Sequence, residues 1–166
     1  MLLDITDSVE NFDFWRQREY LNDATRQLLE NVDVLIVPEE GFRDYSTPLF
    51  PSNMMELYDV LKAHMNVEAV INDEDYREVS LNSKLHRYGK FAVLSVAVPV
   101  FVSVLSNFIS DKLKYAEPAD EIEFEILLQD TSGKVKSIKY KGSADGLKSA
   151  GDKIIQMSKE DGEHKH

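Results

Sequence analysis

Acidic residues follow two short apolar runs that we expect to form parallel strands. Glu40 comes shortly after the run at residues 32–37, and Asp73 and Asp75 follow the run at residues 67–71. Because ligands of open parallel sheets bind beyond the carboxyl ends of the strands, these carboxylates are expected to converge at one edge. Carboxylate oxygens are the ligands that Mg²⁺ prefers. The pattern predicts Glu40, Asp73 and Asp75 as metal ligands, while acids in solvated turns remain the alternative interpretation.

The same segments resemble a known acidic pattern. The stretch VLIVPEEGFRD, with Glu40, Gly41 and Asp44, and the later Asp73 and Asp75 are similar to the metal-binding motifs of Toprim domains. In that family a glutamate after the first strand and an Asp-x-Asp pair after a later strand hold Mg²⁺ for phosphodiester chemistry. The resemblance implies a Mg²⁺-dependent phosphodiester or nucleotide enzyme. The family pattern has another helix and strand between its motifs, whereas this chain has room for one helix.

The composition indicates a folded, acidic protein. The chain has 166 residues, of which 43% are hydrophobic, so it fits one domain that can bury a sizeable core. Its formal net charge of -11 repels a phosphate backbone, so nucleic acid is not an expected partner. The sequence contains no cysteine, which excludes disulfides and thiol chemistry. The N-terminal segment lacks the pattern of a secretory signal, so we expect a cytoplasmic protein, with no cofactor other than Mg²⁺ in the enzyme alternative.

Hydrophobic periodicity predicts an α/β arrangement in the first part of the chain. Apolar residues recur at helical spacing in two segments, and two short runs rich in Val and Ile favour buried strands. A strand, a helix and a second strand in succession favour a right-handed βαβ unit with parallel strands. The predicted elements are a helix at 14–30, a strand at 32–37, a helix at 53–65 and a strand at 67–71, while 76–82 form either an edge strand or an extended connection.

The longest uncharged stretch, FAVLSVAVPVFVSVLSNFIS, covers residues 91–110. Alternate valines would suit a strand, but Pro99 in its middle would remove a ladder hydrogen bond. We therefore predict a second crossover helix over residues 91–114, either buried in the core, packed on a partner protein or homo-oligomer, or inserted in a membrane. Small residues form a stripe along one side of this helix and would permit close approach of another backbone. This predicted interaction surface comprises Ser95, Pro99, Ser103, Ser106 and Ser110.

The C-terminal part of the chain predicts a β-hairpin followed by a helix. Residues 121–128 alternate apolar side chains with glutamates, and residues 135–141 alternate apolar side chains with lysines. A last helix is expected at residues 143–157. The segment FEILLQDTSGKVKSIKYKGSADGLKSAGDKII loosely resembles small accessory modules attached to bacterial conflict-system effectors.

These patterns predict an α/β fold with a small βαβ-type sheet and crossover helices, followed by a C-terminal β-hairpin plus helix as an α+β appendage. The predicted segments are an N-terminal amphipathic helix within 1–31, an α/β core at 32–114, the hairpin and helix at 119–158 and a flexible tail at 159–166. The favoured function is a non-catalytic module that binds a protein partner or ligand as an accessory component of a larger bacterial-type system. The alternatives are the Mg²⁺-dependent enzyme and a membrane-associated protein held by residues 91–110.

Overall fold

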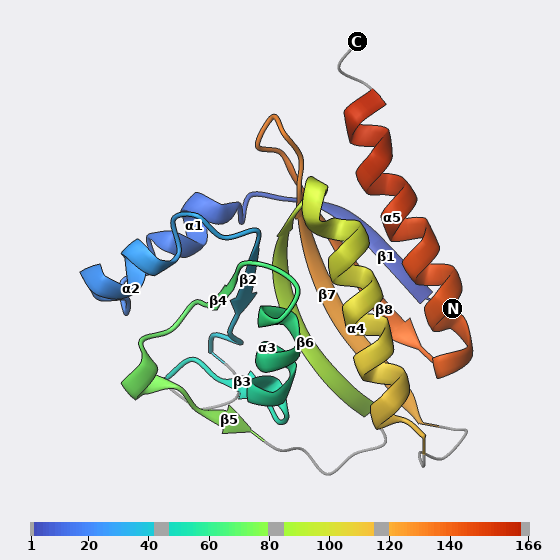
Figure 1. Cartoon of the computed structure of the whole chain (residues 1–166), viewed down its shortest axis with the longest axis horizontal. Helices are drawn as coiled ribbons and strands as arrows, with labels where there is room; N and C mark the ends of the chain where they lie inside the picture. The colour runs from blue at the N-terminus through green and yellow to red at the C-terminus, as the bar shows by residue number, and fades with distance from the viewer. Residues whose placement is uncertain (1, 42–46, 80–84, 115–119, 164–166) are drawn as a thin grey trace.

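A six-stranded mixed sheet lies at the centre of the protein in this computed structural model, which describes residues 2–41, 47–79, 85–114 and 120–163. Helices and strands alternate along most of the chain, which confirms the predicted α/β class. Figure 1 shows the long helices lying across the sheet. The strands, in their order across the sheet, are β1 (Leu2–Ser8), β8 (Val135–Gly142), β7 (Glu121–Gln129), β6 (Leu85–Leu94), β2 (Val34–Val37) and β4 (Val67–Ala69).

Two crossover connections build the parallel part of this sheet. Strands β2 and β4 pair in parallel, and α3 (Met54–Lys62) lies between them in the chain, as the sequence predicts. Strands β6 and β7 also pair in parallel through the helix α4 (Val98–Lys112). The remaining pairs, β2 with β6, β7 with β8 and β8 with β1, are antiparallel. Two short strands, β3 (Phe50–Pro51) and β5 (Glu78–Val79), form a separate parallel pair.

The C-terminal hairpin and helix are confirmed and join this same sheet. Strand β7 pairs with β6 on one side and with β8 on the other, so the hairpin extends the sheet. After β8 a 3-10 turn, η3 (Ala144–Gly146), leads into α5 (Leu147–Glu163). The helix therefore begins a few residues later than the predicted position 143.

The uncharged stretch at residues 91–110 is not one helix. Its first four residues belong to β6, a 3-10 turn η2 (Ser95–Ala97) follows, and α4 starts at Val98. Strand β6 is paired on both edges and is buried on both faces at Phe91, Ala92 and Val93, so its sequence there is continuously apolar and not alternating. Pro99 lies in the first turn of α4, where a missing N–H costs no helical hydrogen bond.

The predicted helix at residues 14–30 is also divided, into α1 (Phe12–Arg16) and α2 (Asp23–Leu28). Each helix has its own asparagine N-cap. The side-chain oxygen of Asn11 accepts a hydrogen bond from the Phe14 N–H at 2.8 Å, and Asn22 accepts one from the Thr25 N–H at 2.8 Å. Asparagine at an N-cap satisfies an otherwise unpaired backbone donor, so Asn22 begins a new helix.

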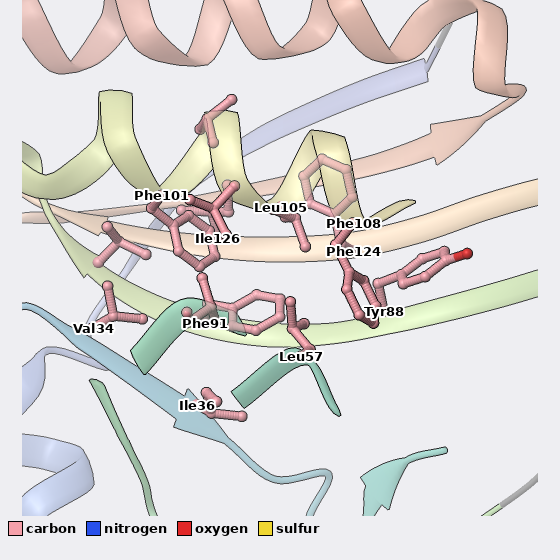
Figure 2. Packing of buried hydrophobic residues seen from close by; sticks show 14 of the residues in the cluster. Val34, Ile36, Leu57, Tyr88, Phe91, Phe101, Leu105, Phe108, Phe124 and Ile126 are labelled. Atoms are coloured by element: carbon pink, nitrogen blue, oxygen red, sulfur yellow. The ribbon is translucent and has the colours of Figure 1, made fainter. Parts of the chain in front are cut away.

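Two hydrophobic clusters cover the two faces of the sheet. Helices α3, α4 and α5 pack on one face, where Phe91 and Phe101 have ring centroids 5.0 Å apart. Figure 2 shows side chains from β2, β6, β7, α3 and α4 meeting in this layer. The smaller cluster on the opposite face joins α1 and the segment around α2 to β2 and β6, with Trp15 only 2% exposed. The large apolar layer therefore accounts for burial of most of α4.

A tight contact at Gly89 connects α3 to the sheet. The register of β6 against β7 shifts between Arg87 and Gly89. Gly89 has φ +119°, a backbone conformation that residues with a side chain rarely adopt. A Cβ atom at Gly89 would lie 2.5 Å from Cε of Met54. The bulge therefore lets the first turn of α3 approach the backbone of β6.

In the part of the chain that the structure describes, no helix is long and apolar enough to cross a membrane.

Candidate functional site

Glu40 lies three residues beyond the end of β2 and is held by two residues from the connection between α1 and α2. The Arg18 guanidinium donates to the Glu40 carboxylate from Nε at 2.9 Å and from Nη2 at 2.7 Å. The hydroxyl of Tyr20 donates to Glu40 Oε2 at 2.6 Å. Arg18 also lies 4.8 Å from the centre of the Phe14 ring. A two-pronged arginine contact of this kind fixes the position and orientation of the carboxylate.

The contacts with Glu40 shift the pKa values of its two partners. The hydrogen bond with Glu40 raises the pKa of Arg18 above its usual value, against a smaller opposing effect of burial. Burial raises the pKa of Tyr20, and its hydrogen bond to Glu40 raises that pKa further, because removing the phenol proton would place a second negative charge beside Glu40. Tyr20 therefore acts as a hydrogen-bond donor throughout the neutral range.

The segment after β4 is joined to the same connection through Asn72. This buried side chain donates from Nδ2 to the Tyr20 carbonyl at 2.7 Å and accepts from the Asn22 N–H at 3.0 Å. It also donates to Asp75 Oδ2 at 3.1 Å. Asn72 thus fixes the loop that carries Asp73 and Asp75 against the loop that carries Arg18 and Tyr20.

The structure brings together two of the three predicted metal ligands. Glu40 and Asp75 line one pocket of about 450 Å³, together with Arg18, Tyr20 and Arg77. Asp73 lines the neighbouring pocket on the side of α3. No group of three or more His, Asp or Glu side chains among the described residues is arranged to hold a metal ion. As a ligand set, Glu40, Asp73 and Asp75 stay a prediction, and the arginine on Glu40 already occupies the position of a cation.

The small-residue stripe is distributed over several environments. Ser95 is buried in η2, Pro99 and Ser106 are half-buried, and Ser103 and Ser110 are exposed on α4. Helix α5 approaches α4 closely at Gly151, where a Cβ atom would lie 3.1 Å from Val102 Cγ1 and 3.7 Å from Ser106 Oγ. One member of the stripe thus meets a helix of the same chain, and partner binding by the others stays a prediction.

Charged side chains form a row across the face of the sheet opposite α4 and α5. In this row Lys90 of β6 lies opposite Glu125 of β7, Glu125 lies opposite Lys139 of β8, and Lys139 lies opposite Asp4 of β1. Lys90 Nζ lies 4.0 Å from Glu125 Oε1 and 3.1 Å from Glu10 Oε2. The charges therefore alternate in sign from strand to strand, an arrangement that stabilises cross-strand neighbours. The row ends on an aspartate at the edge of the sheet.

Strand β1 is that edge. It spans seven residues and pairs with β8 over its whole length. No other strand of the described chain pairs with it, so its outer backbone N–H and C=O groups face away from the sheet. Proteins usually protect such an edge with prolines, bulges or inward-pointing charges, because an open edge pairs with other extended segments. β1 contains no proline and has no bulge in its pairing with β8, and its only charged residues are Asp4 and Asp7.

A groove borders the same edge. It has a volume of about 1290 Å³ and lies between the end of β1, the β7–β8 turn and the C-terminal half of α5. Figure 1 shows α5 running along this side of the molecule beside β1. Apolar side chains line much of it, and among them Ile5 is 36% exposed and Val9 is 87% exposed. The other apolar residues of the lining are Leu128, Val135 and Met157.

Strand β1 is not among the predicted elements, although residues 2–8 contain a signal for it. Leu3 and Ile5 alternate with Asp4 and Thr6, which is the period of a strand with one apolar face. The Arg18 and Tyr20 contacts to Glu40 had no comparable signal, because 22 and 20 residues separate the partners. Comparison of the chain with protein-family models, curated proteins and solved structures found no significant match.

Proposed function

We propose that this chain is a protein-interaction module that binds an extended segment of a partner protein along β1. The observation that supports this function is the coincidence of an unpaired seven-residue sheet edge with a partly apolar groove beside it. In recognition by strand addition, backbone hydrogen bonds supply affinity and pockets for alternate side chains supply specificity. The outer edge of β1 offers the backbone hydrogen-bonding groups, and the groove offers space for side chains.

The exposure of apolar side chains along this edge supports the same function. Ile5 and Val9 leave apolar surface in water, and an added segment would cover part of it. We place the module in the cytoplasm, because its cysteine-free composition suits a reducing compartment. We propose that it acts there as an accessory component of a larger bacterial-type system.

The proposal is tested by titrating ¹⁵N-labelled protein with the synthetic peptide STVTVTS, which alternates apolar and polar residues and matches the length of β1. We expect amide shifts confined to β1 and the groove, and slower hydrogen exchange of the outer β1 amides. The control peptide STVPVTS lacks the central N–H and should bind more weakly. Shifts elsewhere, or equal binding of both peptides, would overturn the proposed mode of binding.

A pair of variants provides a matched control on the protein side. Ile5→Lys places a charge on the apolar side of the edge and should abolish the β1 shifts. Leu28→Lys makes a comparable change at an exposed leucine on α2, and this variant should bind the peptide as the unaltered protein does. The spectra of both variants without peptide show whether each remains folded. If folded Ile5→Lys still binds at β1, the apolar side of the edge is not part of the site.

A further inference from the structure

The row of alternating charges stops at Asp4. Each interior member of the row has a neighbour of opposite charge on both sides, because Glu125 lies between Lys90 and Lys139, and Lys139 lies between Glu125 and Asp4. Asp4 has such a neighbour on its β8 side only, and among the described residues it forms no ion pair. Continuing the pattern by one strand places a cation next to Asp4.

The residues on either side of Asp4 point to the opposite face of the sheet. Leu3 lies opposite Tyr140, and Ile5 lies opposite Ile138, and both of these partners belong to the core beneath α5. A residue added beside Leu3 or Ile5 would therefore adjoin the apolar layer, and Ile5 also lines the groove. Because neighbouring residues of a strand alternate between faces, the two sides of the edge require different chemistry.

A second copy of this chain does not supply that chemistry. Antiparallel pairing of β1 with β1 about a twofold axis has three central registers. The register centred on Asp4 places two aspartates opposite each other, and the registers centred on Ile5 and Thr6 place Asp7 opposite Leu3 or Ile5. Each register therefore contains a like-charge pair or a carboxylate against an apolar side chain, and both are unfavourable.

We infer that β1 takes up a partner segment in which one lysine or arginine is flanked by two apolar residues. The cation lies beside Asp4, and the apolar side chains lie beside Leu3 and Ile5. This inference rests on the proposed function and adds the chemistry of the partner to it. A strand with this pattern carries its cation and its apolar residues on opposite faces, which matches the two faces of the sheet at β1.

The test compares the peptides STVKVTS and STVEVTS, which differ only in the charge of the central residue, against ¹⁵N-labelled protein at low salt. We expect the lysine peptide to bind roughly fivefold more tightly than the glutamate peptide, with the difference reduced at high salt. Equal affinities with shifts at β1 would overturn the predicted charge preference and leave strand addition in place. An absence of β1 shifts with both peptides and with STVTVTS would overturn the proposed function as well.

Charge reversal on the protein gives the decisive comparison. Asp4→Lys should invert the preference, so that STVEVTS binds more tightly than STVKVTS. Asp59→Lys makes the same change on the exposed side of α3, at the other end of the sheet, and should leave the preference unaltered. If both variants change the preference equally, only net charge matters and the site is not Asp4. Sedimentation of the protein without peptide is expected to show monomers, and a dimer with protected β1 amides would identify a second copy as the occupant.

Discussion

Arg18 and Glu40 are 22 residues apart in the chain, and the guanidinium of one forms two hydrogen bonds, at 2.9 and 2.7 Å, with the carboxylate of the other. The contact joins the connection between α1 and α2 to the end of β2. Both residues line a pocket that is also lined by Tyr20, Asp75 and Arg77. Its consequences for stability and for metal binding can be measured separately.

The first prediction concerns the stability that this ion pair supplies. Both side chains are about 30% exposed, so solvent screens the pair in part, and we expect Arg18→Ala to lower the free energy of unfolding by about 1 kcal/mol. Urea denaturation of Arg18→Ala, Glu40→Gln and the double variant gives the coupling between them. Lys114→Ala serves as the control, because the Lys114–Asp111 pair is 64% and 71% exposed and should contribute almost nothing. A coupling energy near zero between Arg18 and Glu40 would show that Arg18 stabilises the fold only by packing against Phe14.

The second prediction concerns Mg²⁺ at the predicted ligands Glu40, Asp73 and Asp75. Because Arg18 and Tyr20 already occupy the oxygens of Glu40, we expect Mg²⁺ to leave the amide signals around Glu40 and Asp75 unchanged. Arg18→Ala frees the carboxylate and should allow weak binding, seen as shifts at Gly41 and Asp75. Specific shifts in the unaltered protein at low Mg²⁺ concentration would instead support the metal site that the acidic pattern predicts. Replacement of Mg²⁺ by Ca²⁺ distinguishes site geometry from charge alone.

The third prediction concerns the contact between α4 and α5. Gly151 has no room for a large side chain, because even a Cβ atom would lie 3.1 Å from Val102. We expect Gly151→Leu to lower the free energy of unfolding by about 1–3 kcal/mol, since it would force the helices apart. Lys148→Leu, at an exposed position of the same helix, should change stability little. If Gly151→Leu is tolerated as well as the control, the two helices are not closely packed at Ser106.

The fourth prediction concerns stability at alkaline pH. Burial raises the pKa of Tyr88 to about 12, against an ordinary value near 10 in the unfolded chain. Between these two values the folded protein binds the phenol proton more tightly, so the contribution is complete below pH ~10 and is lost as the pH approaches ~12. It amounts to roughly 2–3 kcal/mol by linkage. Between pH ~10 and ~12, the free energy of unfolding should fall less steeply with pH for Tyr88→Phe than for the unaltered protein. Identical slopes would show that Tyr88 ionises as freely as an exposed tyrosine.

The sequence by itself determined the elements whose hydrophobic pattern is local. The parallel pair β2 and β4 with α3 between them, and the hairpin of β7 and β8 with α5 after it, follow from periodicity and turn residues alone. The acids at the carboxyl ends of β2 and β4 also came together as expected in part, since Glu40 and Asp75 share a pocket. The strands, helices and turns themselves depend on residues that are close in the chain.

Only the tertiary structure decided the features that depend on neighbours distant in the chain. Phe91 to Leu94 are apolar because β6 is a central strand covered on both faces, and an isolated sequence cannot distinguish such a strand from the start of a buried helix. Arg18 reaches Glu40 only after the α1–α2 connection is placed against β2. Likewise, the pattern of residues 3–6 marks a strand, but its position at the edge of the sheet follows from pairing with β8, more than 100 residues later. Edge position is a property of the whole sheet, and it is what makes β1 available to a partner.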